Sequence, residues 1–303
     1  MLWFRNLQIY RLSADHALSA TSIAGELSKR PFVPCGSMDM DSHGWVAPAR
    51  HEPDSMALER QNAVLVALKS EEKVLPAAVI KDELDYRVQQ IEAAESRKVG
   101  RKEQRELKDR IVEELTPRAF TRSRVQRALL DLENGMVIVD AASAAKAEFL
   151  LSTLRETLGS LPTRLIDTEI SPAAAMTDWL NTETPNAFSL GQDAELKVPG
   201  DEGSIARFKR QVMDCDEVRQ HLDAGKIATR LSLAFGERLT FTLTEALEIK
   251  SLAMLDVLKD ELKDMDAETQ DALFESQFAL LVGELRGFIP ALLDALGGES
   301  QRN

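Results

Sequence analysis

The order of apolar and polar residues predicts a fold that combines antiparallel strands with amphipathic helices. A short apolar run with polar breaks, over residues 2–10, predicts a strand at the start of the chain. The continuous apolar run over residues 63–68 predicts a buried strand. Residues 122–132 and 136–139 predict two strands joined by Asn134-Gly135, a pair typical of tight hairpin turns. We therefore expect an α+β fold with antiparallel sheets and packed helices.

A helical stretch over residues 76–115 is the longest element of the first half. Apolar residues recur every three or four positions before Gly100 and again from Leu107 to Leu115, and Thr116-Pro117 ends the pattern. The first part would be about 30 Å long at 1.5 Å per residue. One apolar stripe per helix is enough for two antiparallel helices to pack together, but not for burial in a core. We therefore predict a helical hairpin that projects as a finger.

The second half predicts another α+β module. Residues 227–235 and 239–243 alternate between apolar and polar side chains, which predicts a hairpin with one buried face. Residues 204–212 predict a further strand, and the chain from about residue 268 predicts a helix with one apolar face. We divide the chain into residues 1–75, an N-terminal α/β part of the first module; 76–127, the finger with a basic segment; 128–165, the remainder of that module; and 166–303, a second module with acidic C-terminal helices.

Composition bounds the class of protein. The chain has 303 residues, 44% of them hydrophobic, which is ample for a packed core. The two cysteines form no disulfide framework and fit a reducing compartment. No apolar stretch is long enough to span a membrane, and the N-terminus does not resemble a signal peptide. We expect a cytoplasmic protein that does not bind membranes.

A basic segment lies within this acidic chain. The formal net charge is −13, yet residues 97–127 contain eleven Lys/Arg and five Asp/Glu, a local balance of +6. Bulk electrostatics would repel a polyanion, so this local concentration of positive charge indicates one directed polyanion-binding surface. Residues 240–303 hold thirteen acids and five bases and should lie away from any bound polyanion.

The sequence gives little support to an enzyme. The four histidines form no metal-binding pattern, and no phosphate-binding, dinucleotide-binding or nucleophile-elbow motif occurs. Asp39 and Asp41 are candidate ligands for a divalent cation, although a turn capped by an aspartate is the more ordinary interpretation. We predict no catalytic residues, no metal and no cofactor.

Two groups of residues are candidate contacts for a polyanion. The first lies on the finger and just after it, and its alternatives are a solvated helix face with ion pairs, for example of Glu103 with Lys98 or Arg101, and a Phe120 that caps the hairpin core or contacts another subunit. The second lies on strands of the second half, where an ordinary exposed sheet face is the alternative. The first group is Arg97, Lys98, Arg101, Lys102, Arg118, Phe120, Arg122 and Arg124; the second is Arg207, Lys209, Arg210, Gln211, Lys226 and Arg230.

Several long segments resemble the recombination-associated RdgC family of proteobacteria. They are MLWFRNLQIYRL, PFVPCGSMDMDSHGWVAP, EEKVLPAAVIKDEL, LTPRAF, LGSLPTRLI, RFKRQ, HLDAGKIATRLSL and GELRGFIPALLDALGGE. The resemblance covers essentially the whole chain. It implies crescent-shaped subunits that close into a homodimeric ring around duplex DNA. It also implies binding without sequence preference, nucleoid association, and negative modulation of RecA in recombination and replication-fork repair.

The resemblance also suggests roles for individual residues. Arg118 and Phe120 would lie on the finger side of the ring, whereas Arg210 and Gln211 match a basic–polar pair at its base. A ring under two-fold symmetry needs two isologous interfaces. The apolar C-terminal helix and the region of Phe120 are the candidates for them. We expect duplex DNA as the ligand, with single-stranded DNA as a further one.

Two other classes of function remain open from the residues alone. An adaptor protein could use the basic finger to grip an acidic partner, and it would not bind DNA at physiological salt. A nuclease could use Asp39 and Asp41 with a divalent metal, and it would cleave DNA in the presence of magnesium.

Overall fold

A single antiparallel sheet runs through the whole chain. The structure is a computed structural model and describes residues 2–13, 18–200, 203–264 and 269–300. Ten strands follow one another across the twelve-stranded sheet, and β3 (Ala57–Arg60) and β7 (Thr163–Leu165) pair with β4 and β1 at its sides. The order is β2 (Asp41–Val46), β4 (Ala63–Lys73), β5 (Thr121–Asp131), β6 (Met136–Asp140), β1 (Leu7–Leu12), β12 (Ile249–Met254), β11 (Leu239–Thr244), β10 (Ile227–Phe235), β8 (Phe188–Lys197) and β9 (Ile205–Phe208). The predicted α+β class with antiparallel strands and packed helices is confirmed.

The N-terminal strand joins the two halves of this sheet. Leu7 in β1 pairs with Ile249 in β12, and the Leu252 N–H donates to the Arg5 carbonyl at 2.8 Å. Strand β1 also pairs with β6 on its other side. The proposed division into four segments stays a prediction, since the sheet is continuous from β2 to β9.

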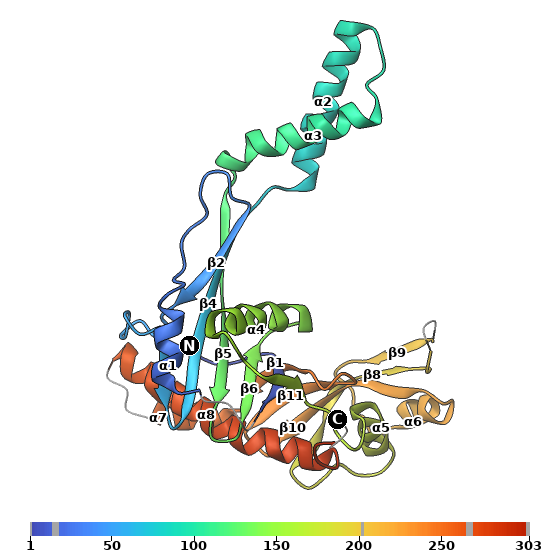
Figure 1. The fold of residues 1–303 in the computed structure, drawn as a ribbon. Coiled ribbons are helices and arrows are strands. Elements are labelled where there is room, and N and C mark those ends of the chain that lie inside the picture. The colour runs from blue at the N-terminus through green and yellow to red at the C-terminus, as the bar shows by residue number, and fades with distance from the viewer. Residues whose placement is uncertain (1, 14–17, 201–202, 265–268, 301–303) are drawn as a thin grey trace.

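Helix α8 (Gln270–Ala295) covers one face of the sheet (Figure 1). Its residues Phe278, Leu281 and Phe288 are fully buried in one large apolar cluster with strands of both halves. Helices α5 (Pro172–Asn181), α6 (Asp216–Asp223) and α7 (Asp256–Asp264) contribute to the same cluster. The apolar face of the C-terminal helix is therefore used within the subunit, and its prediction as a subunit contact is wrong.

The opposite face is covered only in part. Helices α1 (Ala20–Leu27) and α4 (Ala144–Leu158) pack there in a second apolar cluster. Within the described residues, every buried member of that cluster falls between Tyr10 and Leu161. Among the described residues, no helix covers the part of this face formed by β8 to β12 (Figure 1). We call the whole side of the sheet on which α4 lies the α4 face.

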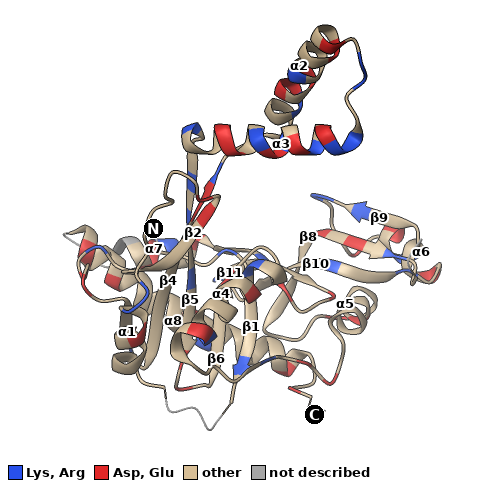
Figure 2. Cartoon of the chain, turned by 45° about the horizontal axis from the view of Figure 1, so that its top comes forward, with Lys and Arg blue, Asp and Glu red and all other residues tan. Residues whose placement is uncertain are grey.

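A pair of helices stands beyond the ends of β4 and β5 (Figures 1 and 2). Helix α2 (Ala77–Glu95) buries no residue, and α3 (Arg101–Leu115) buries only Ile111. A short 3-10 turn, η1 (Thr116–Arg118), leads from α3 to β5. The figures show the two helices crossing each other, so the antiparallel packing expected from the sequence is wrong. Sparse apolar residues limit the contact to the crossing, where the Arg87 guanidinium donates to the Glu114 carboxylate at 2.7 and 3.2 Å.

The strand predicted over residues 204–212 is too long. Strand β9 ends at Phe208. Arg210 has a φ of +54°, and its N–H donates to the Asp193 carboxylate at 2.9 Å. This left-handed backbone turns the chain away from the sheet, so the strand does not extend to Arg210.

In the part of the chain that the structure describes, no helix is both long and apolar enough to cross a membrane.

Candidate nucleic-acid interface

Strand register places three basic residues on the uncovered part of the α4 face. Arg207 lies opposite Glu195, and Glu195 lies opposite Arg230. Residues directly opposite one another in a sheet share a face. Lys250 follows Ile249, whose side chain lies in the large apolar cluster that contains α8, so Lys250 faces the opposite side of the sheet. Strand pairing and the alternation along β12 therefore place basic residues of β9, β10 and β12 on the same face of the sheet.

These residues line a hollow of about 460 Å³. Lys209 lies at its rim next to Arg207, and Thr242 and Ser251 contribute hydroxyls to its lining. Lys250 was not predicted as a site residue, because a lone lysine in a short alternating strand gives no signal without the pairing of β11 with β12. Of the second predicted group, the structure brings Arg207, Lys209 and Arg230 together.

Acidic residues neutralise part of this hollow. The Arg207 guanidinium donates to the Glu195 carboxylate at 2.7 Å, and this hydrogen bond lowers the pKa of Glu195. Lys250 forms an ion pair with Glu248 at 2.8 Å. Lys209 and Arg230 have no ion pair with any described residue, and both are exposed. Asp193 also lines the hollow, so the net positive charge there is smaller than the four bases alone would give.

The other predicted residues of this group lie outside the hollow. Arg210 is exposed in the turn after β9, and the Gln211 amide donates to the Glu217 carboxylate at 2.9 Å. Lys226 is half-buried just before β10. The structure therefore places these three residues beside the hollow but not in its lining.

Strand β5 distributes its arginines between the two faces of the sheet. Arg122 and Arg124 lie on the α4 face and line a second hollow with His43 and Phe149, a residue of α4. The Arg122 Nε donates to the Glu72 carboxylate at 2.8 Å, and this hydrogen bond lowers the pKa of Glu72. Arg124 is exposed and has no ion pair with a described residue.

Phe120 is the most exposed large apolar side chain of the described residues, at 87%. The interpretation that it caps the hairpin core is therefore wrong. Its backbone is held in place, since the Phe120 carbonyl accepts the Val74 N–H at 2.8 Å. Arg118 lies two residues earlier, exposed and without an ion pair in the described chain. This exposed pair is suited to contact a partner rather than to stabilise the subunit.

Of the four predicted bases on and next to the crossed helices, Arg97 is closely paired, Lys102 is weakly paired, and Lys98 and Arg101 have no ion pair with a described residue. The Arg97 guanidinium donates twice to Glu103, at 2.7 Å each, and once to Glu95 at 2.5 Å. Glu103 therefore pairs with Arg97 instead of with Lys98 or Arg101, as the solvated-face interpretation had suggested. Lys102 is 93% exposed, with Glu106 at 4.0 Å. Lys98 and Arg101 are exposed without an ion pair among the residues that the structure describes.

The basic groups lie across from one another. Figure 1 shows the crossed helices above one end of the sheet and β8 and β9 at its other end, with α4 on the sheet between them. All of them border the same α4 face, so this side of the subunit is concave. A polyanion lying there would meet positive charge from several elements.

Only one group in the described part of the chain has the geometry of a metal site. His51, Glu52 and Glu275 place their ligand atoms within 4.8 Å of one another. The Arg60 guanidinium already lies between the two carboxylates, at 2.8 Å from Glu52 and 2.7 Å from Glu275. The Arg60 guanidinium therefore already supplies a positive charge to these two carboxylates. Asp39 caps a turn, since its carboxylate accepts the Gly36 N–H at 2.9 Å.

Comparison with known proteins covers nearly all of this structure. A protein-family model described as "Putative exonuclease, RdgC" matches residues 2–299. The chain belongs to the RdgC family. The resemblance seen in the sequence motifs is thereby confirmed.

Curated members of the RdgC family match over their full length. The chain is 46% identical over 300 residues to the recombination-associated protein RdgC of Laribacter hongkongensis, covering 99% of this chain and 100% of the relative. It is 41% identical over 302 residues to the RdgC protein of Dechloromonas aromatica, covering 98% of each. The RdgC protein of Pseudomonas aeruginosa is 40% identical over 300 residues, again with 98% of each chain covered. The residues that match the family thus include both the crossed helices and the twelve-stranded sheet.

Proposed function

We propose that this RdgC-family chain binds double-stranded DNA without sequence preference on its α4 face and acts in recombination. The observation that carries the proposal is the concave arrangement of unpaired bases, from Arg118 and Arg124 to Lys209 and Arg230, on a chain of net charge −13. Lys and Arg without intramolecular partners can release counterions from a phosphate backbone. Backbone contacts of this kind position a duplex but do not read its sequence.

The concave shape also supports a closed assembly of two subunits. A crescent with charge on its inner side becomes a positively lined ring when a second copy closes it by two-fold symmetry. Phe120 is our candidate for one of the contacts, because it is an exposed aromatic side chain on a fixed backbone. In a ring, DNA would be held by topology as well as by charge.

Occupancy of duplex DNA is sufficient for the proposed effect on recombination. A ring on DNA would limit RecA filament assembly and strand exchange without any catalytic step. We place this activity at the nucleoid and at replication forks under repair, and we propose that no nuclease chemistry is involved. The interpretation as an adaptor for an acidic partner predicts no DNA binding at physiological salt.

Salt dependence and DNA topology test this proposal together. We expect the affinity for duplex DNA to fall steeply with salt, by about 0.9 logarithmic units per phosphate contact for each tenfold increase in salt. We expect slower dissociation from linear DNA with blocked ends than from DNA with free ends. The measurement is fluorescence anisotropy for affinity and competitor-chase dissociation for the two DNA forms, with magnesium present and the products analysed on a gel. Tight binding that is insensitive to salt would contradict a phosphate-binding surface, and end-dependent cleavage would show a nuclease instead.

Release of Arg97 from Glu103 should strengthen DNA binding. In the Glu103→Gln variant, Arg97 loses its bidentate partner and keeps only Glu95, so part of its guanidinium can contact a phosphate and we expect the Kd to fall by about two- to fivefold at low salt. The matched control is Glu106→Gln, which removes one negative charge from the same helix next to the weakly paired Lys102. Equal gains in both variants would mean that total charge, and not the release of Arg97, is responsible.

A further inference from the structure

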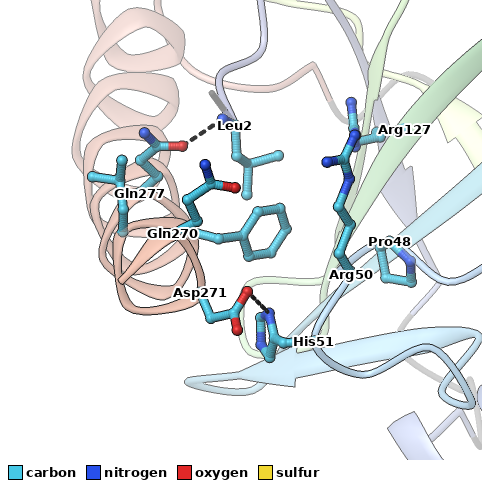
Figure 3. A pocket seen from close by; sticks show the side chains of 10 residues that line it. Leu2, Pro48, Arg50, His51, Arg127, Gln270, Asp271 and Gln277 are labelled. Atoms are coloured by element: carbon cyan, nitrogen blue, oxygen red, sulfur yellow. Dashed lines mark hydrogen bonds and ion pairs between the residues drawn. The ribbon is translucent and has the colours of Figure 1, made fainter. Parts of the chain in front are cut away.

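A cavity of about 440 Å³ lies on the side of the sheet opposite to the α4 face. It is enclosed by Leu2, by Pro48, Arg50 and His51 from the segment between β2 and β3, by Arg127 of β5, and by the first two turns of α8 (Figure 3). Arg127 lies two residues before Leu129, whose side chain is buried in the α8 cluster. The alternation along β5 therefore directs Arg127 away from Arg122 and Arg124. The sheet separates this cavity from the proposed DNA-binding surface.

Arg127 enters this cavity without a partner. Its Nε is fully buried and has no hydrogen-bond acceptor in the described residues. Asp140 attracts it electrostatically but forms no ion pair with it, and the Asp140 Oδ1 already accepts the N–H groups of Arg5 and Asn6 at 3.0 Å. A guanidinium removed from water without a bound anion is costly, and burial accordingly lowers the pKa of Arg127.

Arg50 supplies a second positive charge. Its side chain is exposed and has no ion pair within the described part of the chain. Figure 3 shows Arg50 and Arg127 on one wall of the cavity, with Gln270 and Gln277 of α8 on the other. The carboxylate among the lining residues is that of Asp271, and it lies 3.8 Å from the His51 Nδ1. Among the described residues, no carboxylate therefore forms an ion pair with either arginine.

The remaining walls of the cavity are apolar. Leu2, Pro48, Leu273 and Phe274 line it, and the Phe274 ring packs edge-on against His51 with centroids 5.7 Å apart. A cavity of this size, mostly apolar with a few convergent polar groups, is typical of a small-ligand site. Paired guanidinium groups are well matched to a carboxylate, which accepts two parallel hydrogen bonds.

We propose that this cavity binds a carboxylate that carries an apolar group. Arg50 and Arg127 would hold the carboxylate, and Leu2 and Phe274 would contact the apolar part. Both a free hydrophobic acid and the C-terminal residue of a polypeptide offer this chemistry. The proposal does not depend on DNA binding, because the site lies on the other side of the sheet.

The test uses the full chain and isothermal titration calorimetry with N-acetyl-L-phenylalanine as the probe. We expect saturable binding that becomes weaker by about tenfold or more with the neutral N-acetyl-phenylalanine amide, because the charge-assisted hydrogen bonds are lost. Arg127→Met and Arg50→Ala should each cause a similar loss. Since Arg50 is exposed, its variant should fold even if Arg127→Met does not. Arg219→Ala, at an exposed arginine of α6, is the matched control and should bind the probe like the wild type.

Further ligands in the same titration distinguish the possible sources of the ligand and show which results would contradict the proposal. A tetrapeptide with a C-terminal phenylalanine should bind at least as tightly as the probe if the natural ligand is a chain terminus, and more weakly if it is a free acid. Equal binding of acid and amide, no effect of Arg50→Ala, or no binding of the probe would each overturn the proposal. Inorganic phosphate that binds as tightly as the probe would overturn the role of the apolar walls. Displacement of the probe by a short DNA duplex would show a DNA contact instead.

Discussion

Reversing the charge of Arg118 and Arg230 together should weaken binding of duplex DNA by about 100-fold at roughly 0.15 M salt. Both side chains are exposed and have no ion pair with a described residue, so each is free to contact a phosphate. A glutamate at either position removes one attraction and adds one repulsion. Fluorescence anisotropy over a range of salt concentrations should also show a shallower salt dependence for the Arg118→Glu/Arg230→Glu variant.

A control with the same change in charge separates location from total charge. Lys29 follows α1 and Lys259 lies on α7, and neither is among the residues that line the two basic hollows. The Lys29→Glu/Lys259→Glu variant should lose no more than about threefold in affinity, as expected for charges about a Debye length or more from the ligand. Equal losses in the two double variants would show that the net charge governs binding and that the α4 face is not the site.

Local patterns in the sequence predicted the elements well where one periodicity dominated. Residues 227–243 alternate cleanly, and the hairpin of β10 and β11 has the expected buried face with Arg230 on the other side. Which strands pair with one another was harder to predict from the sequence. Strand β1 pairs Leu7 with Asp140 of β6 on one side and with Ile249 of β12 on the other, and no local pattern encodes that choice.

The same limit explains why Lys250 was missed and why Arg207 looked free. A count of charges along the chain cannot show that Glu195, twelve residues before Arg207, lies directly opposite it in the sheet. The structure therefore sorts the predicted bases in a way that the sequence could not. Arg97, Arg122 and Arg207 have close carboxylate partners, whereas Lys209 and Arg230 have none in the described residues.

The C-terminal helix shows a different limit. Its apolar face was predicted correctly, but the surface that it covers was not. Apolar periodicity indicates that a helix is buried, and it does not distinguish the chain's own sheet from a second subunit. The choice was decided by the two halves of the sheet, which leave one large apolar face that a helix of 26 residues can cover.

Replacing Arg286 with methionine should lower the free energy of unfolding by about 3 kcal/mol at neutral pH. Arg286 fastens α8 to the sheet, since its guanidinium donates to the Asp131 carboxylate at 2.7 and 3.0 Å and to the Gln61 carbonyl at 2.8 Å. Asp131 is buried, so loss of the arginine leaves a carboxylate that neither water nor another cation compensates. Urea unfolding followed by circular dichroism measures the change. Arg219→Met is the matched control, because its exposed pair with Asp214 should contribute less than about 1 kcal/mol.

The effect of Arg286→Met should shrink as the pH falls. Burial alone would raise the pKa of Asp131, but hydrogen bonds from Arg286 and Asn134 outweigh it and lower that pKa below its ordinary value. A lowered pKa in the folded state stabilises the protein above the unfolded pKa of about 3.9, and this contribution is lost as the pH falls through the folded value. Without Arg286, burial dominates and the pKa of Asp131 rises. As the pH falls, Asp131 is therefore protonated in the variant before it is protonated in the wild type, and this removes the cost of the buried, unpaired carboxylate. The difference between wild type and variant should therefore be largest near neutral pH and decrease below about pH 5. A difference that stays constant with pH would show that Arg286 acts through packing alone, and that the ion pair with Asp131 does not hold α8 on the sheet.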